Sequence, residues 1–133
     1  MKQKIGYVDG FVLVVPKKNI KAYRAMAKDG VKLWMKHGAL ECKECVGDDL
    51  NSNMGGMTMP TFIKTAKAKP NETVVFSYIG YKSRAHRDQV NARVMKDPYM
   101  NTPKQENKPM PFDPKRMAYG GFKVIVGAQN IME

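Results

Sequence analysis

The chain has 133 residues, of which 43% are hydrophobic and 26% are charged, the balance of an ordinary soluble globular protein. This length suffices for one domain over residues 1–133, with a core that needs no disulfide or metal. The formal net charge of +11 favours acidic partners such as nucleic acid, anionic lipid or a phosphorylated ligand. The basic residues are scattered along the chain, so charge alone does not choose among these partners.

The N-terminal stretch, MKQKIGYVDGFVLVVPKK, places basic residues before an apolar run, as a signal peptide does. Asp9 interrupts this run, which alternates in polarity and ends at Pro16 without a small-residue cleavage site. No segment approaches the roughly 20 consecutive apolar residues that span a bilayer. We therefore expect a cytoplasmic protein without a membrane partner, whose first strand covers residues 7–15.

The next segment predicts a helix over residues 19–37. Its apolar side chains, from Ile20 to Trp34, recur at helical spacing. Asn19 is the expected N-cap, and Gly38 is the expected stop at the C-terminal end.

A second strand is expected over residues 39–47, and it contains the sequence CKEC with Cys42 and Cys45. Thioredoxin-like chemistry needs such a pair at a helix N-terminus. Residues three apart in a strand are separated by about 10 Å and point to opposite faces, so they cannot form a disulfide. A structural zinc site needs two more ligands. We interpret both residues as small, partly buried thiols.

A long connection over residues 49–71 follows, with a short helix expected near residues 61–66. Its methionines, Met54 to Met59 in MGGMTM, are soft ligands that would suit copper(I). The chain has eleven methionines in all, and a flexible flap over an apolar pocket explains the cluster without a metal.

The strongest strand is predicted over residues 72–81. Ser83 is a candidate N-cap for a second helix, which stops before Pro98. A proline-rich connection over residues 97–117 then leads to the last strand, over residues 117–126.

The order β-α-β-β-α-β predicts an α+β, ferredoxin-like fold with a four-stranded antiparallel sheet. Two helices cover only one face of such a sheet, yet the first and third strands carry apolar side chains on both faces. These are Val8, Val12 and Val14 against Phe11, Leu13 and Val15, and Val74, Phe76 and Tyr78 against Val75 and Ile79. Because an uncovered apolar face is an association site, we expect a homodimer whose two sheets pack together.

Six segments also carry a family resemblance, in the order YVDGFV, HGAL, ECVGDD, ETVVFSYI, DPYM and MPFDPKRMAYGGF. They resemble the signature blocks of the YbaA-like bacterial proteins, a domain of unknown function, over nearly the whole chain. The resemblance implies a dimeric α+β barrel, but no established reaction. Relatives in the wider fold group include cofactor-free monooxygenases, haem-binding enzymes and ligand-sensing modules, so the fold does not choose a chemistry.

The topology brings both long connections to one end of the sheet, where loops on a rigid scaffold commonly form sites. Arg116 can clamp a carboxylate or phosphate there, and Tyr119 can donate a hydrogen bond or a proton. Alternatively, Arg116 pairs with Asp113 or Asp49 and only locks the loop. The second and fourth strands should be opposite edges of the sheet, about 14 Å apart. Asp48 and Arg116 could therefore share a site only through loop reach or a partner subunit.

Asp9 is unusual because an ionised carboxylate inside an apolar strand is costly unless it is paired or hydrogen-bonded. It is a candidate general base with a raised pKa. The competing interpretation is structural, with Asp9 bonded to backbone groups beside Gly10 or to a cross-strand partner.

We expect the protein to bind a small anionic or aromatic molecule in a pocket near the loop-rich end. If it is an enzyme, the candidate catalytic residues are Asp9, Asp48 and Tyr119, and the candidate ligand-binding residues are Arg116, Asp49 and Asp113. No cofactor or metal is expected.

An alternative function is nucleic-acid binding by a basic face on the second predicted helix, formed by Lys82, Arg84, Arg87, Arg93 and Lys96. The sheet lacks the aromatic pattern of ferredoxin-like RNA binders, which counts against this alternative. A further alternative is an interaction or regulatory module without catalysis.

Overall fold

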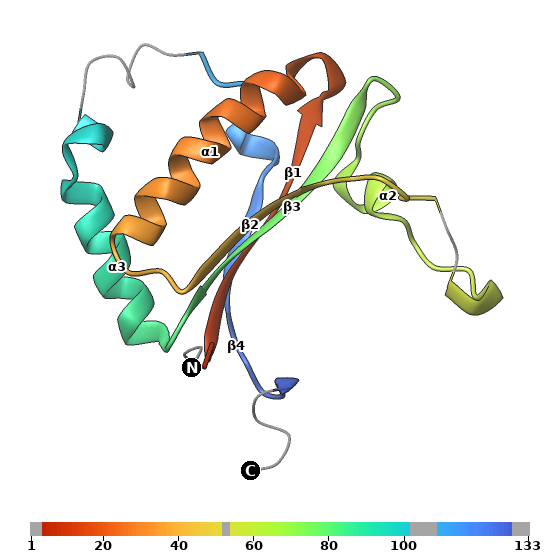
Figure 1. Cartoon of the computed structure of the whole chain (residues 1–133). Helices are drawn as coiled ribbons and strands as arrows, with labels where there is room; N and C mark the ends of the chain where they lie inside the picture. The colour runs from red at the N-terminus through yellow and green to blue at the C-terminus, as the bar shows by residue number, and fades with distance from the viewer. Residues whose placement is uncertain (1–3, 52–53, 102–108, 129–133) are drawn as a thin grey trace.

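A computed structural model describes residues 4–51, 54–101 and 109–128 of the chain. Its strands and helices are β1 (Tyr7–Pro16), α1 (Ile20–Lys36), β2 (Glu41–Val46), α2 (Phe62–Ala66), β3 (Glu72–Tyr81), α3 (Arg84–Lys96) and β4 (Ala118–Lys123) (Figure 1). The predicted β-α-β-β-α-β order is confirmed, with α2 as a short addition between β2 and β3. Among the described residues, no helix is long and apolar enough to cross a membrane.

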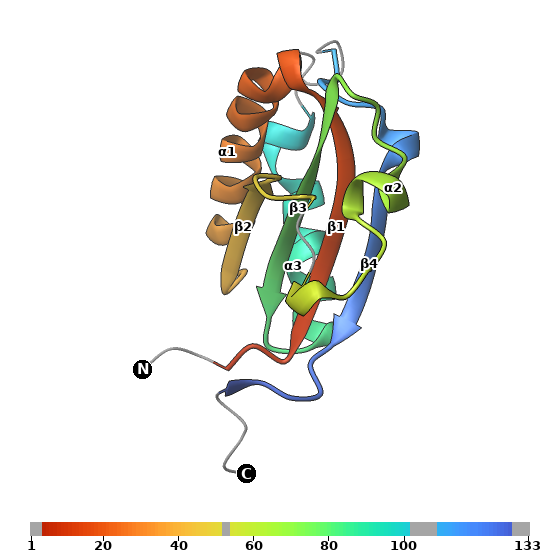
Figure 2. The same ribbon diagram turned by 90° about the vertical axis from the view of Figure 1, so that its right-hand side faces the viewer.

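The four strands form one antiparallel sheet in the order β2-β3-β1-β4 (Figure 2). β1 and β3 are therefore central, and β2 and β4 are the two edges, as the topology predicts. α1 and α3 lie on one face of the sheet, and α2 lies on the other (Figure 1). This arrangement confirms the ferredoxin-like α+β fold.

The core lies between the sheet and the helices α1 and α3. Side chains alternate along a strand, so Leu13 and its cross-strand partner Val75 face the helices together. They form one buried cluster with Tyr23 of α1. A second buried cluster surrounds Tyr81, at the opposite end of β3, and includes Val90 of α3.

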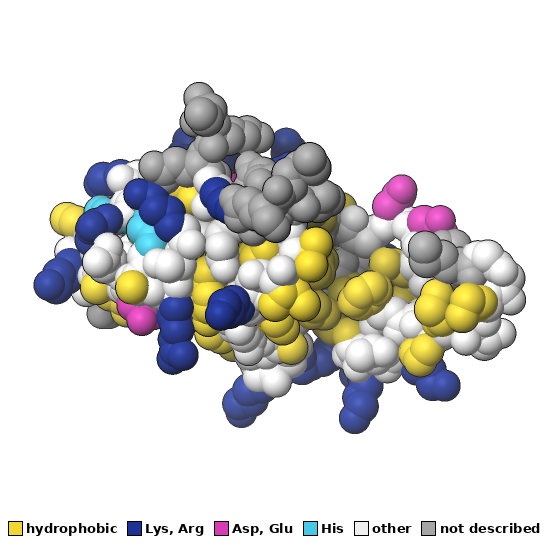
Figure 3. Space-filling model, turned by 90° about the horizontal axis from the view of Figure 1, so that it is seen from below, with side chains coloured by type: hydrophobic (Ala, Val, Ile, Leu, Met, Phe, Trp, Pro, Cys, Tyr) yellow, Lys and Arg dark blue, Asp and Glu magenta, His cyan; other side chains and the backbone are white. Residues whose placement is uncertain are grey.

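The face of the sheet opposite α1 and α3, called the open face here, carries Val8, Val12, Phe76, Tyr78 and Phe122. Two of these aromatic side chains are largely exposed, Phe76 at 47% and Phe122 at 62%. Hydrophobic side chains gather across the middle of the molecule in the view from below (Figure 3). An apolar face of this kind is a surface for association.

α2 covers one end of this face. It contacts both β1 and β3, and the paired residues Val14 and Val74 are buried at that end. The Thr61 side chain caps α2 by accepting a hydrogen bond from the backbone N–H of Lys64.

Most element ends agree with expectation to within two residues. Ser83 caps α3 by accepting from the His86 N–H, and Gly38 after α1 has a φ of +111°. Asn19 occupies the N-cap position of α1 as expected, but its side chain makes no capping hydrogen bond, and its amide donates to the Pro111 carbonyl. β4 ends at Lys123 rather than at residue 126.

Candidate functional site

Asp9 is buried on β1, and its ion-pair partner comes from α3 above the sheet. Arg87 Nη1 donates to Asp9 Oδ1 at 2.8 Å, and the same nitrogen donates to the Tyr119 hydroxyl at 3.1 Å. The Asp9 side chain is only 2% exposed. The structure therefore brings together Asp9 and Tyr119, two of the three predicted catalytic residues, around a guanidinium group.

The residue opposite Asp9 on β4 is Gly121, which leaves room for the Tyr7 ring beside the ion pair. The Tyr7 ring lies against Gly121, and the Arg87 guanidinium lies 5.1 Å from the centre of the same ring. Burial raises the pKa of Asp9, while Arg87 and the Tyr119 hydroxyl act in the opposite direction. The arrangement holds a charged pair in the core and links α3 to β1 and β4.

Sequence reasoning placed Arg87 on the basic face of α3 and missed its role. The signal that could have found it is spacing, because Arg87 precedes Val90 by three residues and Val94 by seven. Both valines are fully buried, so Arg87 lies on the inward face of the helix. An arginine on the buried face of a helix can pair with a carboxylate on the strand that the helix covers.

Arg116 is engaged with the start of β3. Its guanidinium contacts both oxygens of Glu72, with Nη1 to Oε2 at 2.6 Å and Nη2 to Oε1 at 3.0 Å, and it also donates to the Lys67 carbonyl at 3.0 Å. Arg116 holds the pKa of Glu72 down at about 2. These contacts support the alternative in which Arg116 pairs with a carboxylate of the protein and holds its loop in place. The partner is Glu72, however, and not Asp113 or Asp49.

The other acidic candidates lie apart from these two clusters. Asp48 and Asp49 follow the end of β2 and are exposed. Asp113 is exposed as well, and its carboxylate caps the short turn at Pro114–Arg116 by accepting from the Lys115 N–H.

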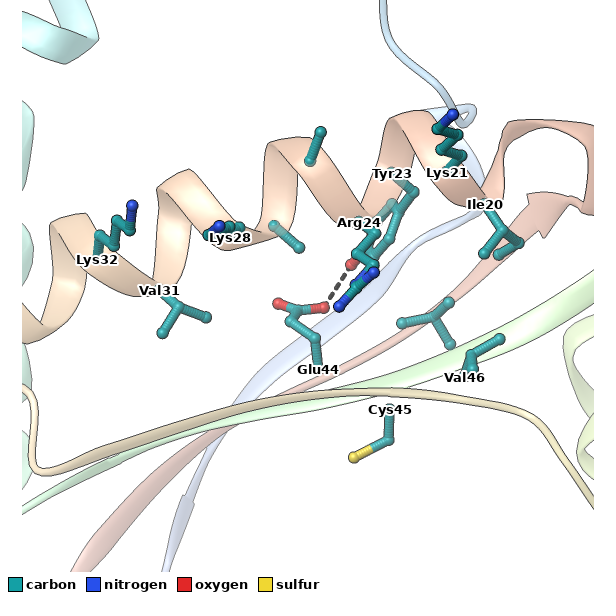
Figure 4. A pocket seen from close by; sticks show the side chains of 13 residues that line it. Ile20, Lys21, Tyr23, Arg24, Lys28, Val31, Lys32, Glu44, Cys45 and Val46 are labelled. Atoms are coloured by element: carbon teal, nitrogen blue, oxygen red, sulfur yellow. Dashed lines mark hydrogen bonds between the residues drawn. The ribbon is translucent and has the colours of Figure 1, made fainter.

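A groove of about 850 Å³ opens between α1 and the β2 edge (Figure 4). It occupies the end of the sheet where β1 and β2 finish, which is the loop-rich end. Its lining comprises Ile20, Lys21, Tyr23, Arg24, Ala25, Ala27, Lys28, Val31 and Lys32 of α1, Glu44, Cys45 and Val46 of β2, and Val75 of β3. We call this feature the α1–β2 groove.

A hydrogen-bonded carboxyl group lies at the floor of the α1–β2 groove. The Tyr23 hydroxyl donates to Glu44 Oε1 at 2.6 Å, and the buried Ser77 side chain also hydrogen-bonds Glu44. Glu44 is an exposed residue, and its side chain points from β2 toward α1 (Figure 4). Burial raises the pKa of Glu44, and it raises the pKa of Tyr23 as well.

The rim of the groove is cationic. Lys21, Arg24, Lys28 and Lys32 all belong to α1 and are exposed. Arg24 extends from the helix into the groove, whereas Lys21 and Lys32 point away from the sheet (Figure 4). Within the part of the chain that the structure describes, neither Arg24 nor Lys28 forms an ion pair. Sequence reasoning missed Glu44 and Arg24, because one lies inside the CKEC segment and the other among ordinary surface cations.

The two cysteines are both free, as predicted, and they differ in exposure. Cys42 is half-buried, and burial together with the nearby Glu44 and Glu41 raises its pKa to about 12. Cys45 is exposed, which corrects the expectation of partial burial, and its side chain points away from α1 (Figure 4). Across the described ranges, no three His, Cys, Asp or Glu side chains come together as metal ligands. The Met54 side chain lies outside the described residues.

Two of the five cations assigned to the basic face of α3 interact with other parts of the protein. Arg87 turns inward to Asp9, and Arg93 Nη1 donates to the His37 carbonyl at 3.0 Å. Lys82, Arg84 and Lys96 are exposed.

Comparison with known proteins agrees with the fold and identifies the family. Residues 6–114 match the family described as Protein of unknown function (DUF1428), and the chain belongs to this family. It is 45% identical over 120 residues to the Uncharacterized protein YbaA of Escherichia coli strain K12, which covers 90% of this chain and 97% of that protein. The YbaA of Shigella flexneri matches to the same extent. These findings confirm the resemblance to the YbaA-like proteins.

One solved structure with the same fold is a dimeric ferredoxin-like protein from an uncultured marine organism. The match has a TM-score of 0.50 and covers 92% of this chain and 99% of that one, at 12% sequence identity. At this identity the likeness concerns the fold alone.

Proposed function

We propose that this protein is a homodimer that binds a small anionic or aromatic molecule in the α1–β2 groove of each subunit. The observation that carries the proposal is the combination found in that groove: an Arg24 at the rim that forms no ion pair with the described residues, apolar walls and a hydrogen-bonded carboxyl group at the floor. Ligand sites are concave and mostly apolar, with a few convergent polar groups.

The dimensions and chemistry of the groove support this function. Its volume of about 850 Å³ falls within the range of small-molecule sites, about 300–1,000 Å³. Ile20, Val31 and Val46 supply apolar contacts for a ring or hydrocarbon body. The Arg24 guanidinium, which forms no ion pair with the residues that the structure describes, is available for a bidentate contact with a carboxylate or phosphate.

The dimer is supported by the open face of the sheet. Phe76 and Phe122 expose large aromatic rings on this face. Met57, Met59 and Phe62 are also exposed in the segment around α2, on the same side of the sheet (Figure 2). The ferredoxin-like neighbour is described as dimeric, and a second copy would remove these side chains from water.

Binding is tested by titration calorimetry of the wild-type protein with benzoate, butanoate and inorganic phosphate at low salt. We expect at least one of these anions to bind, and Arg24→Ala to weaken its binding at least tenfold. Arg84→Ala removes an equally exposed arginine from α3 and is expected to leave the affinity unchanged. An equal loss of anion affinity in both variants would indicate general charge attraction. If none of the anions binds, the proposed function is refuted.

The dimer is tested separately by sedimentation equilibrium. We expect the wild type to sediment as a dimer and Phe76→Lys to sediment as a monomer. The matched control is Met95→Lys, which places the same charge at an exposed apolar residue of α3 and should leave the dimer intact. A monomeric wild type, or a dimer that survives Phe76→Lys, would contradict the assignment of the open face.

A further inference from the structure

We infer that the molecule bound in the α1–β2 groove is a small hydroxy acid, with its carboxylate at Arg24 on the rim and its hydroxyl group hydrogen-bonded to Glu44 at the floor. This inference rests on the proposed binding function and adds the chemical class of the ligand. The side chains that carry it come from two facing elements, α1 and β2.

The floor of the groove has hydrogen-bonding capacity that the protein does not use fully. A carboxylate offers about four lone-pair positions on its two oxygens. The Tyr23 hydroxyl occupies one position on Oε1, and the Ser77 side chain occupies another position on the carboxyl group, so about two of the four remain. The other oxygen of Glu44 is directed along the groove toward Val31 (Figure 4). A donor on the ligand can therefore bond to Glu44 without displacing Tyr23.

The charge of the rim decides which kind of donor fits. A hydroxyl group and an ammonium group can both donate to a carboxylate. Four cations of α1 belong to the lining, and Arg24 among them extends into the groove, whereas Glu44 is the single carboxyl group of the lining (Figure 4), so a positively charged ligand group would be repelled. A neutral hydroxyl group is free of this repulsion, and the same cations attract the acid group of the ligand.

The apolar lining defines the remainder of the ligand. Ile20, Val31 and Val46 present branched aliphatic side chains on either side of Arg24 and Glu44 (Figure 4), which favour an aromatic ring or a short hydrocarbon as the body of the ligand. When such a body displaces water from the floor, Glu44 would lose hydrogen bonds unless the ligand replaces them. A ligand with a hydroxyl group is thereby preferred over the same acid without one.

The experiment compares matched acids that differ by one hydroxyl group: benzoate against 3-hydroxybenzoate and 4-hydroxybenzoate, and butanoate against 4-hydroxybutanoate. We expect the wild type to bind at least one hydroxy acid at least tenfold more tightly than its parent acid, as measured by titration calorimetry. Glu44→Ala is expected to bring the affinities for the hydroxy acid and its parent acid to within about twofold of each other.

Two further variants separate the role of the carboxyl group from a structural role. Tyr23→Phe removes the Tyr23 hydrogen bond but leaves the carboxyl group of Glu44, and it should keep the preference for the hydroxyl group. Glu41→Ala removes another carboxylate from the same strand, one that pairs with Lys43 at 3.4 Å. This variant should also keep the preference for the hydroxyl group. Should Glu44→Ala fail to fold, Glu44→Gln is used, and a much reduced preference is expected.

The outcomes distinguish the inference from the proposed function. If parent and hydroxy acids bind equally, or if Glu44→Ala retains the preference, the inference is overturned while the binding function stands. If none of the acids nor phosphate binds, the proposed function itself fails, and the inference fails with it.

Discussion

Two carboxyl groups of the sheet face the helices, each beside a tyrosine, and they differ in how their charge is satisfied. Asp9 lies on the central strand β1 and is held by the Arg87 guanidinium at 2.8 Å. Glu44 lies on the edge strand β2 and accepts a hydrogen bond from the Tyr23 hydroxyl at 2.6 Å. No cation of the described chain pairs with Glu44.

The position in the sheet explains this difference. A central strand has neighbours on both sides and a helix above, so a carboxylate there is cut off from water and needs a cation. An edge strand is open on one side, where water or a ligand can reach the carboxyl group. The same chemical group is thus structural at Asp9 and available for binding at Glu44, a distinction that the following predictions test.

The largest effect is expected from removing the cation at Asp9. Arg87→Met leaves the carboxylate buried without a partner and should lower the free energy of unfolding by about 3–5 kcal/mol. Urea denaturation measures this change. Arg84→Met, three residues earlier and exposed, should change stability by less than about 0.5 kcal/mol. A loss below about 1 kcal/mol for Arg87→Met would show that the pair is not the link described here.

A second prediction concerns the pair as a unit. In the double variant Asp9→Asn with Arg87→Met, no charge is left buried without a partner, so most of the lost stability should return. We expect the double variant to be more stable than Arg87→Met alone by at least about 1 kcal/mol, because a buried pair is often replaceable by neutral groups. Denaturation of the wild type, Asp9→Asn, Arg87→Met and the double variant under the same conditions measures the coupling. If the stability losses of the two single variants simply add in the double variant, Asp9 and Arg87 are not coupled.

A smaller effect is expected at the edge strand. Tyr23→Phe removes one hydrogen bond to Glu44 and keeps the buried ring, so stability should fall by about 1 kcal/mol. The partly exposed carboxyl group can recruit water in its place. A loss as large as that of Arg87→Met would mean that Glu44 is as structural as Asp9, and the contrast between the two would not hold.

The smallest effects are opposite pH dependences of two glutamate variants. The folded-state pKa of Glu72 is lowered from 4.5 to about 2 by Arg116, so its contribution to stability is present above pH 4.5 and is lost as the pH falls toward 2. The pKa of Glu44 is raised from 4.5, so the folded state binds the proton more tightly and stability declines as the pH rises through that raised value.

Thermal melts across the acid range measure both slopes. Relative to the wild type, Glu72→Gln should lose stability as the pH rises from 3 to 6, whereas Glu44→Gln should gain it. Slopes of the same sign would show that one of the two environments is described incorrectly.

The sequence predicted the fold well because its local signals are strong and consistent. Alternation in β1 and β3, helical spacing in α1 and the cap at Ser83 each indicate one structure, and the family resemblance agrees with them. The end of β4 was overestimated because Val124, Ile125 and Val126 are apolar. Two of them lie exposed beyond the sheet, Ile125 at 87% and Val126 at 73%.

The site was predicted less completely because its residues come from elements far apart in the chain. The cost of burying Asp9 was evident from its strand, but its partner Arg87 lies 78 positions away. Glu44 resembles any charged residue of an edge strand until α1 is folded against it. Arg116 was expected to clamp a ligand or to pair with Asp113 or Asp49, whereas its partner is Glu72, and this pairing depends on how the loop after α2 closes.

The side-by-side placement of β1 and β4 has a consequence for how the protein is made. Tyr7 at the start of β1 pairs with Lys123 at the end of β4. β1 therefore leaves the ribosome before its partner strand β4 has been synthesised. β1 and β3 can pair once Tyr81 has emerged. At 5–20 residues per second, synthesis from there to Lys123 takes roughly 2 to 8 seconds. Throughout that interval one edge of β1 has unpaired backbone groups that a neighbouring nascent chain can bind.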